Sequence, residues 1–89
     1  MHVLDRAKAD ALQMLARALG TAELSAQEFS QPPSRALGDL AFPCFKIAAA
    51  AGKKPGEFAA ELRPRLMPLG FIERVHVTGP YLNFFFDRQ

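Results

Sequence analysis

The residues best suited to recognition chemistry lie near the C-terminal end, in the run 81–86, which reads YLNFFF. Successive side chains of an extended strand point to opposite faces, so Tyr81, Asn83 and Phe85 share one face. The other face is wholly apolar and is the one that a core would bury, because burying an unpaired Asn83 there would cost about 1–3 kcal/mol. An aromatic ring two residues from an amide can stack on a nucleobase while the amide pairs with the base edge. The alternation therefore predicts either a base-reading face or, alternatively, a core strand or subunit interface.

Three further side chains are suited to contacts with a nucleic acid. Val75 and Val77 alternate with polar residues, so His76 points outward, where it could stack on or donate to RNA or be a surface histidine without a role. Lys53 and Lys54 lie in the link between two expected helices, where they could contact phosphates or be solvated charges at helix ends. Both interpretations of each residue stay open.

No group of residues predicts catalysis or metal binding. Glu57 and Glu61 share a helical face, as carboxylates do on most solvated helices. Cys44 lies between Phe42 and Phe45 and is expected to be a small core residue. One cysteine excludes an internal disulfide and a cysteine-based zinc site, and two histidines are too few for a metal centre. Glycine-rich phosphate-binding patterns are absent, so no cofactor is predicted.

Length and charge narrow the function classes further. The chain has 89 residues and a mass of 9.8 kDa, which predicts a single domain over 1–89 and excludes most large-enzyme architectures. A net charge of +2 allows a nucleic-acid partner but does not by itself indicate one. Residues 1–19 carry several charges and contain neither a signal peptide nor a membrane span, so a cytoplasmic protein without a membrane partner is expected.

The first half of the chain is expected to form a helix and a short strand. Apolar residues recur every three or four positions from Leu4, which predicts an amphipathic helix closed by Gly20. Residues 28–31 form a short apolar-polar stretch that the consecutive prolines 32–33 stop, which indicates an edge strand.

Two more helices are expected in the middle of the chain. Asp39 is suited to cap the first of them, with Pro43 in its first turn and Gly52 at its end. Pro55 is suited to the first position of the second helix, which Pro64 is expected to kink or stop near residue 63.

The last part of the chain is expected to be a hairpin. Residues 74–78 alternate in polarity, residues 79–80 read Gly-Pro and mark a turn, and 81–86 form the final strand. The predicted fold is α+β, with a small antiparallel sheet of about three strands covered on one face by three helices, in the order α-β-α-α-β-β.

The order of these motifs resembles the N-terminal domain of arginyl-tRNA synthetases. The resemblance covers nearly the whole chain and rests on LGDLAFPCF at 37–45, the alanines at 48–50, Lys-Pro at 54–55 and VHVTGPYLNF at 75–84. It implies a domain that precedes the catalytic domain and holds the outer corner of tRNA by contacting the D-loop. Carried over by position, Tyr81 is implied to stack on a D-loop base and Asn83 to meet its edge, with Thr78 making another polar contact.

The resemblance also limits what this chain does alone. The sequence contains no signature like the His-Ile-Gly-His or Lys-Met-Ser-Lys motifs of class I synthetases, so this chain is not expected to activate arginine. It is expected to be an excised domain or a free-standing relative, with tRNA as its partner and a synthetase catalytic domain as a second one. The alternative is a protein–protein interaction module in which Tyr81 and Phe85 form an apolar patch.

Overall fold

The computed structural model describes residues 3–20, 24, 26–32 and 35–86. The described chain forms three α-helices, three strands and three short 3-10 turns, in the order α1 (Val3–Leu19), η1 (Ala26–Glu28), η2 (Arg35–Leu37), β1 (Leu40–Pro43), α2 (Phe45–Ala50), α3 (Pro55–Leu62), η3 (Arg63–Arg65), β2 (Ile72–Thr78) and β3 (Tyr81–Phe86). No helix among these residues is long and apolar enough to cross a membrane.

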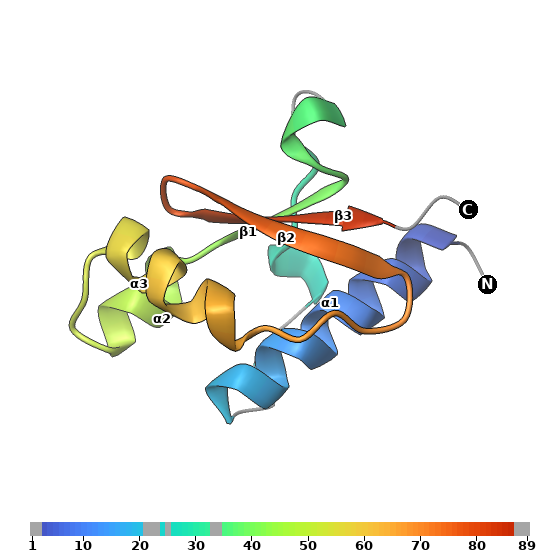
Figure 1. The fold of residues 1–89 in the computed structure, drawn as a ribbon. Coiled ribbons are helices and arrows are strands. Elements are labelled where there is room, and N and C mark those ends of the chain that lie inside the picture. The colour runs from blue at the N-terminus through green and yellow to red at the C-terminus, as the bar shows by residue number, and fades with distance from the viewer. Residues whose placement is uncertain (1–2, 21–23, 25, 33–34, 87–89) are drawn as a thin grey trace.

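The three strands form one antiparallel sheet in the order β1-β3-β2. The α-helices lie on one side of this sheet, with α1 passing beneath it and α2 and α3 near the turn between β2 and β3, whereas η2 projects on the other side (Figure 1). This arrangement confirms the predicted fold class and the predicted order of helices and strands.

The core lies between α1 and the inner face of the sheet. Leu82 and Phe84 of β3 and Phe42 of β1 are fully buried. Ala7 and Ala11 of α1 are fully buried too, and their small side chains let the helix approach the sheet closely. The two-residue periodicity of β3 therefore buries Leu82 and Phe84, as the alternation predicts.

The position of the first strand differs from the expectation. Within the expected strand 28–31, only Ser30 forms a β-bridge, through two 2.8 Å backbone hydrogen bonds with Ala41. The strand of the sheet is instead β1, whose Leu40 pairs with Phe84 in the central strand. β1 occupies the edge because it can bury Leu40 and Phe42 in the core, where Phe42 packs against Phe29, whereas residues 32–33 are prolines and offer no ladder donors.

The second helix also begins later than expected. Asp39 does not cap it: a carboxylate oxygen of Asp39 accepts the backbone N–H of Phe86 at 3.0 Å. The backbone N–H of Asp39 donates to Phe84 at 2.9 Å, so this residue ties the start of β1 to β3. Pro43 accordingly ends a strand, and α2 starts only at Phe45.

The remaining boundaries agree with the sequence. α3 begins at Pro55 and ends at Leu62, and Pro64 lies in the 3-10 turn that follows. The turn at 79–80 joins two strands whose facing ends, Thr78 and Tyr81, pair with each other.

Candidate nucleic-acid interface

The register of the β2–β3 hairpin gathers the predicted recognition residues on the outer face of the sheet, away from α1. Three cross-strand pairs stand side by side there: Thr78 with Tyr81, His76 with Asn83, and Arg74 with Phe85. Side chains of directly opposed residues on one face contact each other, so these three pairs form a continuous surface. We call it the outer ladder.

A hollow of about 320 Å³ lies at the hairpin end of the outer ladder. Tyr81, Thr78 and Asn83 line it from the sheet, and Leu37 lines it from η2. Ala41 of β1 and residues 30–32 complete its wall. The Tyr81 side chain is 38% exposed, so its ring is available to a ligand in this hollow.

Asn83 lies on the predicted face but is not exposed there. Only 4% of its surface is accessible, because the chain around Gly38 crosses above it. A β-carbon built on Gly38 would lie 3.4 Å from Asn83 Cβ, which shows how near the two segments are. The Asn83 amide nitrogen donates to Thr78 Oγ1 at 2.9 Å, so the amide is held in one orientation at the floor of the hollow.

Phe45 is a part of this surface that the sequence analysis missed. Its ring packs edge-to-face against Tyr81, with centroids 6.0 Å apart and an interplanar angle of 89°. Phe45 is 50% exposed. The helix expected after Asp39 would instead have placed Phe42 and Phe45 on one apolar face. Pro43 was the missed signal, because a residue before proline is pushed toward extended conformations, so Phe42 could not be in the same helix.

Lys53 and Lys54 lie at the same end of the molecule but do not line the hollow. The α3 N-terminus packs against the hairpin turn, since a β-carbon on Gly56 would lie 3.7 Å from the carbonyl oxygen of Gly79. Lys53 Nζ forms an exposed ion pair with Glu61 at 2.9 Å. Lys54 is exposed at the N-cap position of α3.

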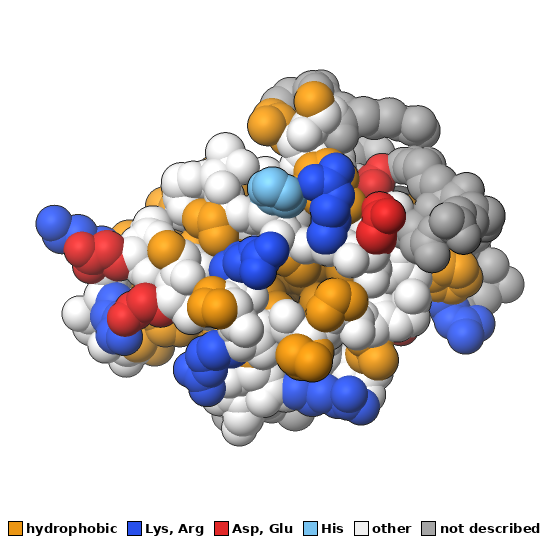
Figure 2. All heavy atoms as spheres, viewed as in Figure 1, with side chains coloured by type: hydrophobic (Ala, Val, Ile, Leu, Met, Phe, Trp, Pro, Cys, Tyr) orange, Lys and Arg blue, Asp and Glu red, His pale blue; other side chains and the backbone are white. Residues whose placement is uncertain are grey.

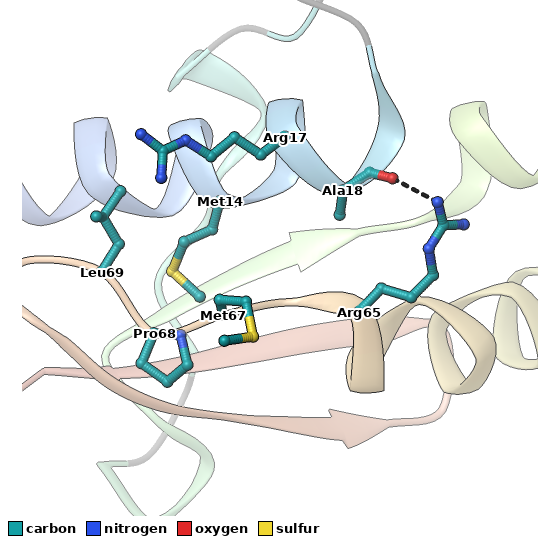
Figure 3. A pocket seen from close by; sticks show the side chains of 7 residues that line it. All are labelled: Met14, Arg17, Ala18, Arg65, Met67, Pro68 and Leu69. Atoms are coloured by element: carbon teal, nitrogen blue, oxygen red, sulfur yellow. Dashed lines mark hydrogen bonds between the residues drawn. The ribbon is translucent and has the colours of Figure 1, made fainter.

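Two of the arginines are used to hold the fold together. Arg63 Nε donates to the backbone carbonyl of Val75 at 3.0 Å. Arg65 Nη2 donates to the carbonyl of Ala18 at 2.8 Å, which satisfies a carbonyl at the C-terminal end of α1 (Figure 3).

Lysine and arginine side chains are spread over the visible face among apolar ones and form no single basic field (Figure 2).

A second hollow, of about 280 Å³, lies on the helix side of the sheet between α1 and the segment that leads into β2 (Figure 3). Its wall is formed by apolar side chains and two arginines, namely Met14, Arg17, Ala18, Arg65, Met67, Pro68 and Leu69. It shares no residue with the outer ladder.

Cys44 is a core residue, as expected. It is fully buried, and burial raises the pKa of its thiol to about 11. Its Sγ lies 4.0 Å from the carbonyl oxygen of Phe42.

Among the described residues no group of three or more His, Cys, Asp or Glu side chains is placed to hold a metal ion.

Comparisons with known proteins identify the family to which the sequence is similar. The model of the family described as "Arginyl tRNA synthetase N terminal domain" matches residues 5–86. The arginine–tRNA ligase of Clostridium perfringens is 51% identical over 57 residues, which cover 64% of this chain and 10% of that protein. The arginine–tRNA ligase of Clostridioides difficile is 44% identical over 58 residues, or 65% of this chain and 10% of that protein.

A solved structure gives the same match in three dimensions. The arginyl-tRNA synthetase of Thermus thermophilus superposes with a TM-score of 0.69 and 28% identity, over 86% of this chain and 13% of that one. The chain aligns with only about a tenth of the length of the curated relatives.

Proposed function

The chain belongs to the family of arginyl-tRNA synthetase N-terminal domains, and from that premise we propose that it binds tRNA at the outer corner and reads a base of the D-loop. Tyr81 stacks on the base, Asn83 meets its edge, and Thr78 orients the amide of Asn83. No step of catalysis is assigned to this chain, which acts as one binding domain over residues 1–89 in the cytoplasm. Where a catalytic domain is present, it is the second partner.

The hollow beside Tyr81 is the observation that carries this proposal. A partly exposed aromatic ring, an oriented amide and a hydroxyl meet at one cavity of about 320 Å³. A ring offers a stacking surface for any base, and an amide offers both a donor and an acceptor to the base edge. A free strand or loop is the form of RNA whose bases can be turned out into such a cavity.

Affinity is expected to be modest. A net charge of +2 supplies only a few phosphate contacts. Discrimination therefore depends on the base contacts, and losing one stacked base costs about 1–3 kcal/mol, or about five- to 150-fold in affinity.

The test is tRNA binding by the 89-residue chain with Tyr81→Ala and Asn83→Ala. Tyr81→Ala is expected to lose about five- to 150-fold whichever D-loop base is present, because stacking does not depend on base identity. Asn83→Ala is expected to lose about as much on tRNA with the preferred base and much less on tRNA with that base changed. Phe71→Ala is the matched control, since Phe71 is a similarly exposed aromatic, at 36%, outside the hollow. If Tyr81→Ala and Asn83→Ala bind every tRNA as tightly as the parent, the proposal is wrong.

The exposed pair of Phe45 and Tyr81 also suits a protein–protein contact, which is the competing function. Salt separates the two. RNA binding weakens steeply as salt rises, whereas an apolar interface responds little.

A further inference from the structure

The outer ladder has a second, smaller hollow beyond Asn83. Its volume is about 110 Å³, and Arg74, His76 and Phe85 form its far side. Leu37, Thr78 and Asn83 line both hollows, so the two cavities are neighbours on one surface.

Arg74 lies over the ring of Phe85 at this smaller hollow. Its guanidinium carbon lies 3.9 Å from the centroid of the Phe85 ring, and the His76 ring packs against Phe85 at 5.6 Å with an interplanar angle of 70°. A cation above an aromatic face is attracted by the ring, and a guanidinium stacked in this way keeps the N–H groups at its edges available. Among the described residues, no carbonyl or carboxylate accepts a hydrogen bond from the guanidinium of Arg74.

Size and charge favour a phosphate as the occupant. The smaller hollow has about a third of the volume of the larger one, so the smaller group, a phosphate, is assigned to it and the base to the larger hollow. None of the described residues that line the hollow is acidic. The fork of N–H groups on a guanidinium matches two oxygens of one phosphate.

We infer that Arg74, stacked on Phe85, binds the RNA backbone phosphate next to the base that Tyr81 receives. This inference rests on the proposed function. Tyr81 and Phe85 are four residues apart on one strand, roughly 13 Å. A single RNA strand that runs along β3 can therefore place a base in the larger hollow and a neighbouring phosphate in the smaller one.

The salt dependence of tRNA binding tests the inference. Arg74→Ala is expected to weaken binding about tenfold or more, equally for tRNAs that differ in the D-loop base, and to reduce the slope of log affinity against log salt by about 0.7–1. Arg74→Lys is expected to keep the slope and lose affinity, because a point charge cannot reproduce the stacked fork.

Arg6 supplies the matched control. Its guanidinium also lies over an aromatic ring, 5.7 Å from the centroid of Phe71, but it lines neither hollow of the outer ladder. Arg6→Ala is expected to leave both the affinity and the salt slope unchanged. Thermal unfolding of each variant shows that it is folded.

A chemical change in the RNA locates the phosphate. In a D-loop hairpin, each linkage is replaced in turn by an uncharged methylphosphonate. One linkage beside the base read by Tyr81 is expected to weaken binding of the parent chain about tenfold and to have no further effect on Arg74→Ala.

The outcomes separate this inference from the proposal on which it rests. If Tyr81→Ala loses affinity and Asn83→Ala loses base discrimination while Arg74→Ala keeps the salt slope of the parent, the phosphate subsite is wrong and base reading stands. If no linkage shows the coupled loss, the subsite is also wrong. If the chain binds no RNA, or Tyr81→Ala changes nothing, both are overturned.

Discussion

The side-chain amide of Asn83 donates a hydrogen bond to Thr78 Oγ1 at 2.9 Å. The two residues belong to different strands of the hairpin, and Asn83 is only 4% exposed. An amide with this little access to water needs its partner, because an unpaired buried donor keeps the full cost of desolvation. Thr78 is therefore a positioning residue for Asn83.

Thr78→Val tests this relationship. The substitution keeps the shape of the side chain and removes the acceptor, so the free energy of unfolding is expected to fall by about 1–3 kcal/mol. Urea unfolding measures it, with Thr78→Ser as the control that keeps the hydroxyl and costs much less. A valine variant as stable as the parent would show that the Asn83 amide does not depend on Thr78.

Phe45→Ala tests whether the edge-to-face contact orients Tyr81. Such a contact contributes about 0.5–1.5 kcal/mol, so tRNA affinity is expected to fall about two- to twelvefold. Stability is expected to change little, since half of the Phe45 side chain is exposed. Binding of tRNA at fixed salt measures the effect. Phe71→Ala serves as the control, and equal affinities of the two variants would argue against this role.

The face of β3 that carries Tyr81 could be predicted because the information is local. Leu82 and Phe84 must both be buried, and a period of two then leaves Tyr81 and Asn83 on the opposite face. The two ends of α3 could also be predicted from local sequence, since Pro55 and Pro64 each restrict the turn in which they lie.

The parts that were wrong depend on contacts distant in sequence. Leu40 is in a strand because it pairs with Phe84, and no pattern around Leu40 reveals that partner. Asn83 is buried because the chain at Gly38 crosses over it. The exposure of Phe45, by contrast, had a local signal in Pro43, which keeps Phe42 extended in β1 and lets α2 start only at Phe45.

The two lysines at the α2–α3 link are expected to differ in their effect on RNA binding. Lys54→Ala should reduce the slope of log affinity against log salt by about 0.7–1, the value for one phosphate contact. Lys53→Ala should reduce it less, because Glu61 already neutralises Lys53 at 2.9 Å. Salt titrations of tRNA binding measure both. If Lys53→Ala reduced the salt slope more than Lys54→Ala, the phosphate contact would belong to Lys53 and not to Lys54. Glu61→Gln should then be tested for a gain in tRNA affinity.

Cys44 is expected to make the free energy of unfolding fall at high pH. Burial raises the pKa of its thiol from 9.0 to about 11, so the folded state keeps the proton at pH values where the unfolded chain loses it. The contribution of the protonated Cys44 thiol to the free energy of unfolding is full below pH 9 and is lost as the pH rises through about 11. The difference in unfolding free energy between the parent and Cys44→Ala is expected to shrink over this window. Alkylation of the folded chain at pH 8 should be slow, and a rapidly reacting thiol would contradict the burial.

Gly38→Ala tests the segment that covers Asn83. Gly38 has φ +110°, and a β-carbon there would lie 3.2 Å from the carbonyl oxygen of Phe84. Gly20→Ala is the matched control, since Gly20 has φ +70° and nothing within 4 Å of an added β-carbon. Gly20→Ala bears a backbone cost of about 1–2 kcal/mol, and Gly38→Ala is expected to lose about 1–3 kcal/mol more, because its φ lies farther from the left-handed helical region and because of the close contact. Because relief of that contact lifts the chain away from Asn83, Gly38→Ala is also expected to weaken tRNA binding, whereas Gly20→Ala should not. Equal stability losses and equal tRNA affinities in the two variants would mean that the close packing over Asn83 contributes nothing to the site.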